Sequence, residues 1–169
     1  RQESRKSSSR LMRTFLTLVS VALLSACGSV STPPPPAQLP SYAFSSLRDS
    51  AVTVVAVDER TGEPREAWQG RLDSDVRDAL QKAGVQVVSD APTRLEFHLL
   101  RARSDIEYRH WKGCVEISGK VVGPKNVEAV GDACVTRANF WGKKSADHVL
   151  RLAYQDALSK VLSALDAQL

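Results

Sequence analysis

Residues 114–135 read CVEISGKVVGPKNVEAVGDACV, and this stretch decides the fold that the sequence predicts. Apolar and polar residues alternate on both sides of Gly123-Pro124-Lys125, a pattern that is typical of a β-hairpin. Pairing the two runs around this turn puts Val121 opposite Val127 and collects the apolar positions on one face. A shift by one residue would mix charged and apolar side chains on that face, so the hydrophobic pattern specifies the register. The other pairs that it predicts are Ile117–Gly131, Val115–Ala133, Lys120–Glu128, Glu116–Asp132 and Cys114–Cys134.

Three further strands are predicted upstream of the hairpin. Residues 51–57 are nearly all apolar, so we expect a central strand that is covered on both faces. Residues 85–88 form a short apolar run, and residues 95–108 alternate. The alternation changes parity along the last strand, which predicts a β-bulge between Leu100 and Ser104.

Two helices complete the pattern. Apolar residues follow helical spacing over residues 72–83, and Gly84 is a suitable C-terminal stop. A longer helix begins with Ser145 as the expected N-cap and carries an apolar stripe to Leu165. The predicted order is β-α-β-β-β-β-α. This order favours the α+β class, with two helices packed on one face of a largely antiparallel sheet.

The start of the chain has the pattern of an export signal. Phe15–Ala26 is a short apolar run that follows basic residues, and it falls below the roughly 20 residues that span a bilayer. Leu24-Ser25-Ala26-Cys27 resembles the lipobox of bacterial lipoproteins, which makes Cys27 the lipid-modified (palmitate-bearing) first residue of the mature chain. The alternative is a plain secretory leader followed by a chance cysteine. The sole methionine is Met12, which leaves open whether residues 1–11 belong to the natural protein.

The segment after Cys27 predicts a tether. Residues 29–40 include four successive prolines, which favour polyproline II and a stalk of up to roughly 37 Å. The alternative is a proline-rich ligand for a recognition domain. The chain is therefore divided into a leader (1–26), a lipidated cysteine with its tether (27–41) and a periplasmic α+β domain (42–169). No aspartate follows Cys27, which favours the outer membrane, facing the periplasm.

An exported chain also predicts a disulfide. Cysteines in an oxidising compartment tend to pair, and the hairpin register sets Cys114 opposite Cys134. Cross-strand Cα separations of about 4.5–5.5 Å can be bridged by a disulfide. The alternative is a catalytic thiol, although no histidine lies near either cysteine in a recognisable motif.

The net charge argues against a nucleic-acid partner. The formal charge is +4, but residues 28–169 carry 18 basic and 18 acidic side chains and are neutral. A neutral mature chain has no basic excess to attract nucleic acid.

The order of motifs resembles the YajG-like bacterial outer-membrane lipoproteins. The resemblance is carried by the leader, the lipobox, the proline tether and the Val-rich strand. It is also carried by the long hairpin and by the motifs Asp58-Glu59-Arg60-Thr61, Ala83-Gly84-Val85 and Arg137-Ala138-Asn139-Phe140. It implies a lipid-anchored protein with a small α+β domain, and it implies no particular chemistry.

Few residues are candidates for chemistry. His98, His110 and His148 share no metal-ligand spacing, and no nucleophile or nucleotide motif occurs, so we expect no catalytic residues, metal or cofactor. His98 is expected to face solvent or to be hydrogen-bonded. We expect the three acidic residues of the first helix to form a solvated face, with two arginines as partners; these are Asp73, Asp75, Asp78, Arg71 and Arg77.

Four aromatic residues flank the two ends of the hairpin: Tyr108, Trp111, Phe140 and Trp141. They form either ordinary packing contacts or a patch for a partner or a glycan. Together these observations predict a non-catalytic envelope lipoprotein whose partners are the membrane, through its lipid, and another envelope protein or copies of itself. It would serve as an accessory part of a transport or export complex. The alternative is a cell-wall or lipid hydrolase.

Overall fold

The computed structural model describes residues 33–61, 65–139 and 142–169. Its elements follow the predicted order. They are β1 (Ala51–Asp58), α2 (Glu66–Lys82), β2 (Gln86–Val87), β3 (Thr93–Glu107), β4 (His110–Val122), β5 (Val127–Ala138) and α3 (Lys143–Gln168). In this part of the chain no helix is both long enough and apolar enough to cross a bilayer.

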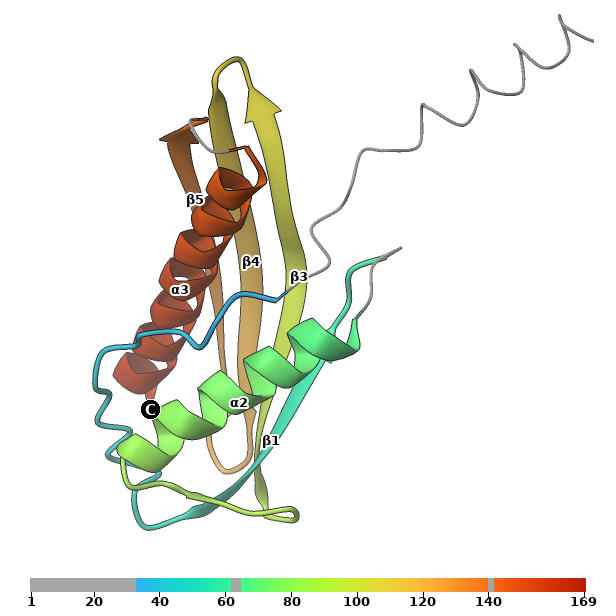
Figure 1. Ribbon diagram of the computed structural model, residues 1–169. Helices are drawn as coiled ribbons and strands as arrows, with labels where there is room; N and C mark the ends of the chain where they lie inside the picture. Colours follow the sequence, from blue (N-terminus) through green and yellow to red (C-terminus); the bar gives the residue numbers. More distant parts are fainter. Residues whose placement is uncertain (1–32, 62–64, 140–141) are drawn as a thin grey trace, which may run out of the picture.

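The strands form one five-stranded sheet in the order β2-β1-β3-β4-β5. β1 runs parallel to β2 and β3, and the long strands β3, β4 and β5 are antiparallel. Both helices lie on the same face of the sheet (Figure 1). The predicted α+β class with helices on one face is therefore confirmed.

The expectation that β1 is covered on both faces is wrong. Burial alternates along this strand, so that Val52 and Val54 are buried while Val55 and Val57 are only partly covered. Both helices lie on one face, so no helix of the described residues covers the apolar side chains of the other face.

The hairpin register agrees with the prediction pair by pair. Val121 lies opposite Val127, and Cys114 lies opposite Cys134. The predicted bulge is also present, but it lies between Leu99 and Arg101, slightly earlier than expected. After this bulge Ala102 faces the same side of the sheet as Val115, so the strand keeps its inward face past the irregularity.

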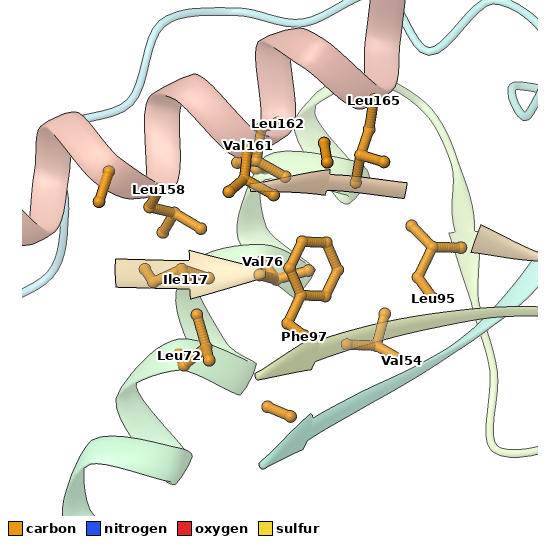
Figure 2. Close-up of a cluster of buried hydrophobic side chains, with 14 of the residues drawn as sticks. Val54, Leu72, Val76, Leu95, Phe97, Ile117, Leu158, Val161, Leu162 and Leu165 are labelled. Carbon is orange, nitrogen blue, oxygen red and sulfur yellow. The ribbon is translucent and has the colours of Figure 1, made fainter. Parts of the chain in front are cut away.

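The core lies between the sheet and the two helices (Figure 2). α3 buries the whole predicted stripe, and Leu158, Val161, Leu162 and Leu165 lie on its side towards the sheet, where Figure 2 also shows Phe97 and Ile117. A close approach of α3 to β5 depends on Gly131, where an added Cβ would lie 2.1 Å from the carbonyl oxygen of Ala157.

The helix ends differ from expectation in detail. α3 begins at Lys143 with Gly142 as its N-cap, so Ser145 lies inside the first turn instead of capping it. α2 ends at Lys82, and Gly84 follows with a φ of 82°. That left-handed conformation suits glycine at the end of a helix, as predicted.

Residues 33–47, called the strap below, pack on the domain. The strap crosses the helical layer (Figure 1). Pro34 is buried, and Phe44 and Leu47 belong to the core. Leu39 packs against the core as a partly buried residue.

Hydrogen bonds fasten the strap to both helices. The Ala37 N–H donates to Asp75 of α2 (3.3 Å), and the Phe44 N–H donates to Asp166 of α3 (2.6 Å). The predicted free stalk is therefore wrong for residues 33–40, and the domain begins before residue 42. Acceptors on the helices, which the local sequence of the strap does not reveal, hold this extended segment against the domain.

Candidate functional site

The outer part of the β3–β4 hairpin, together with the chain segment around the start of α3, forms one end of the molecule (Figure 1). This region is called the hairpin end below and comprises residues 101–112, 135–139 and 142–151. Pairing between β1 and β3 stops at Asp58 and Leu99. Beyond Leu99, β3 is therefore paired with β4 alone among the described strands.

Exposed apolar side chains lie at the hairpin end. Tyr108 is fully exposed in the turn, and its φ of 56° is unusual for a bulky residue. Ile106 is 55% exposed, and Trp111 lies opposite it in the ladder. Of the predicted aromatic patch, Tyr108 and Trp111 thus share one hairpin, while Phe140 and Trp141 lie outside the described residues.

Charged side chains surround this apolar group. Arg103 pairs with Asp105 (2.8 Å), and Lys112 pairs with Glu107 (3.3 Å). Within the described residues Arg109 makes no ion pair, so its charge at the turn is uncompensated by a carboxylate.

One arginine resolves a repulsion that the hairpin register predicted. Glu116 and Asp132 lie directly opposite each other on β4 and β5. Arg101 of β3 reaches both, at 3.5 Å from Glu116 and 2.8 Å from Asp132. The third strand therefore supplies the charge that lets the two acidic side chains face each other.

An open cavity of about 580 Å³ lies where β5 meets the start of α3. Its lining residues are Arg137, Ala138, Lys144, Ser145 and His148. Lys144 and His148 lie 7 and 11 residues after Arg137 in the sequence. Sequence analysis placed Arg137 only in a motif of the family resemblance and did not group it with Lys144 or His148. The fold collects them by turning the chain from β5 into α3.

A buried polar cluster follows β1. Asp58 and Arg60, from the polar Asp58-Glu59-Arg60-Thr61 motif, form a two-point ion pair with N–O distances of 2.8 and 2.6 Å. Both are buried, and the Arg60 guanidinium lies 4.8 Å from the ring centroid of Trp68. Trp68 in turn meets Tyr154 edge to face. These contacts tie the end of β1 to both helices.

The expectation that Asp75 belongs to a solvated helix face is wrong. Asp75 is 3% exposed and accepts a hydrogen bond from the Tyr154 hydroxyl (2.9 Å). Burial raises the pKa of Asp75, and the hydrogen bonds from Tyr154 and Ala37 and the charge of Arg71 oppose this rise. Burial also raises the pKa of Tyr154 well above its ordinary value.

The two arginines of α2 that were expected as partners both lie near an aspartate of the helix. Asp73 pairs with Arg77 at 2.6 Å, and Arg71 lies 3.7 Å from Asp75. Asp75 differs because it faces Tyr154 of α3 and the strap, two contacts that helical spacing alone does not predict.

The strongest arrangement for acid–base chemistry lies on the face of the sheet without helices. His98 Nδ1 is 2.6 Å from Glu59 Oε1, and Ser118 lies opposite His98 on β4. No hydrogen bond joins His98 to Ser118 among the described residues. Nor does that part of the chain group three or more residues able to hold a metal ion.

Cys114 and Cys134 are joined by the predicted disulfide, with Cα atoms 4.1 Å apart. The short separation matches a non-hydrogen-bonded pair of an antiparallel ladder. The bridge lies on the face of the sheet away from the helices, because the adjacent positions Val115 and Ala133 are the buried ones.

Neither a family model nor a curated protein matches this sequence. The fold is similar to that of a Xanthomonas campestris protein of family DUF330, with TM-score 0.51, 13% identity, and coverage of 83% of this chain and 94% of that one. It is also similar to a hypothetical protein of Chlamydia trachomatis, with TM-score 0.51, 11% identity, and coverage of 70% and 96%. A minor lipoprotein from Acinetobacter baumannii has TM-score 0.49, 8% identity, and coverage of 70% and 92%. At these identities the likeness shows the fold alone.

Proposed function

We propose that this chain is an envelope lipoprotein, anchored through lipid on Cys27, whose α+β domain acts by binding a partner. The observation that carries the proposal is the distribution of its three cysteines. Cys114 and Cys134 form a disulfide, which is typical of proteins in an oxidising compartment. The remaining cysteine stands directly after the short apolar leader, in a lipobox-like sequence.

The strap supports a domain held close to the membrane. Its first described residue is Pro33, which stands six positions after the anchor residue Cys27. At about 3.3–3.6 Å per residue, the chain from Cys27 to Pro33 spans about 20 Å at most. Each buried CH₂ of the lipid contributes about 0.8 kcal/mol, so several acyl chains hold the protein firmly.

Binding is favoured over catalysis by where the exposed groups lie. The Glu59–His98 pair lies on a sheet face, and His98 makes no hydrogen bond with Ser118. The hairpin end instead presents exposed apolar and basic side chains, which suit recognition. The proposal also includes location in the outer membrane, membership of the YajG-like group and an accessory role in transport or export. These parts rest on the order of motifs in the sequence.

Lipidation is tested by labelling cells with radioactive palmitate. The wild-type chain should incorporate label and sediment with membranes, whereas Cys27→Ala should do neither. The double variant Cys114→Ala/Cys134→Ala is the control and should keep both label and membrane location. Label retained by Cys27→Ala would contradict the proposal.

A further inference from the structure

The charges of the chain are separated in space. Residues 101–112, 135–139 and 142–151, the hairpin end, carry eight basic and three acidic side chains, a net charge of +5. The rest of residues 28–169 carries ten basic and fifteen acidic side chains, a net charge of −5. A chain that is neutral overall therefore has a basic end, and such a field attracts an anionic surface.

The basic charge is available for binding. Arg109, Arg137 and Lys144 are exposed, and none of them makes an ion pair within the described residues. Arg109 lies in the β3–β4 turn, while Arg137 and Lys144 line the cavity at the start of α3. Cations thus lie at the turn itself and beside the hairpin.

The apolar side chains lie among these cations. Tyr108 is fully exposed with a left-handed backbone, and Ile106 is 55% exposed. Neither contributes to the core, and a fully exposed aromatic residue gains no burial energy from the domain. An aromatic ring with a polar tip, set among basic side chains, suits the boundary between lipid headgroups and acyl chains.

We propose that the hairpin end binds an anionic lipid surface, with Tyr108 and Ile106 entering the headgroup region and Arg109, Arg137 and Lys144 contacting lipid phosphates. The choice of a membrane over an acidic protein or polymer rests on the proposed function. An anchor only six residues before Pro33 places the domain within reach of the lipid. The membrane is then the surface that the domain meets most often.

The test uses the mature chain, residues 27–169, with Cys27→Ser, so that no lipid anchor contributes. Its binding to phosphatidylcholine vesicles with and without 30% phosphatidylglycerol is measured by co-sedimentation. We expect binding to the anionic vesicles and at least about tenfold weaker binding to the neutral ones. Arg109→Glu should weaken anionic binding about thirty-fold, since the reversal removes an attraction and adds a repulsion. Tyr108→Ser with Ile106→Ser should weaken it several-fold.

Two matched variants control for general effects. Lys120→Glu makes the same charge reversal on an exposed residue of β4 outside the hairpin end. Val130→Ser removes an apolar side chain that is 57% exposed on β5. Both should bind vesicles within about twofold of the parent chain, and circular dichroism should show all the variants folded.

The proposal is overturned if Arg109→Glu and Lys120→Glu weaken binding equally, or if neutral vesicles bind as tightly as anionic ones. A third pair of results would also overturn it: soluble polyphosphate binds as tightly as the vesicles, and the double variant Tyr108→Ser/Ile106→Ser binds like the parent chain. Those two results together would identify an acidic polymer as the ligand. Because the chain is unlipidated, these results are independent of palmitate labelling. A failure of the lipid anchor and a failure of the hairpin end can therefore be told apart.

Discussion

At the scale of single residues, Gly131 determines how closely α3 can pack on the sheet. Its position leaves no room for a methyl group, since a Cβ would lie 2.1 Å from the Ala157 carbonyl oxygen and 2.7 Å from Val161. The first neighbour is backbone, so the helix itself would have to move. Alternating sequence patterns show that residue 131 faces inward, but not that a helix backbone lies against it.

Gly131→Ala should therefore lower the free energy of unfolding by about 1–3 kcal/mol or more, as overpacking does. Gly70→Ala is the matched control, because nothing lies within 4 Å of a Cβ at that helical position. It should raise stability by up to about 1 kcal/mol. Urea unfolding measures both changes, and equal effects of the two substitutions would contradict the close packing of α3 on β5.

Asp75 makes stability depend on pH. Burial raises its pKa in the folded protein, so the folded state holds the proton to higher pH than the unfolded state. Between the unfolded pKa of about 3.9 and the higher folded pKa, the folded state binds more protons. The free energy of unfolding contributed by this group therefore falls as pH rises through that window.

The Asp75→Asn variant has no ionisable group at this position. Its free energy of unfolding should therefore not show this decrease with rising pH. Relative to wild type, the variant should therefore become more stable as pH is raised from about 4, where the unfolded carboxyl ionises, towards neutrality. Urea unfolding at several pH values measures the difference. Parallel pH profiles for the two proteins would show that the Asp75 carboxyl is not protonated more readily in the folded state.

At the scale of elements, the strap joins the two helices. Deleting residues 33–40 should lower stability by about 1–3 kcal/mol, because buried Pro34, partly buried Leu39 and the Ala37 hydrogen bond are lost. Pro35→Ala with Pro36→Ala is the control, since both prolines are exposed and the change affects mainly the unfolded chain. Thermal unfolding compares them, and a deletion no more harmful than the control would show that the strap contributes nothing.

The disulfide joins β4 to β5, the two strands of the long hairpin. Cys114→Ala/Cys134→Ala should reduce the free energy of unfolding by roughly 3 kcal/mol, because the bridge closes a loop of 21 residues counting both cysteines. Reductant should weaken the wild-type domain by a similar amount and leave the variant unchanged. Two free thiols in denatured, unreduced protein lacking Cys27 would contradict the bridge.

At the scale of the whole molecule, the fold gathers basic side chains at one end of a domain whose chain, over residues 28–169, is neutral overall. The parts of the hairpin end before and after residue 113 are separate in the chain, and the antiparallel pairing of β4 with β5 brings them together. The neutral net charge of residues 28–169 hides this separation of charge, because a sum does not record where each charge lies. The same pairing places Tyr108 and Ile106 beside those cations.

The hairpin register, the α3 stripe and the disulfide pairing were all predictable from the sequence alone, and they share a cause. Each depends on residues close together in the chain, where a period of two or of 3.6 and one short turn decide which side chains meet. Four other features were decided only by the tertiary structure. They are the packing of the strap, the burial of Asp75, the bridging by Arg101 and the basic hairpin end. Each depends on contacts between segments distant in sequence, and local periodicity carries no information about which distant group will supply an acceptor, a counter-charge or a covering surface.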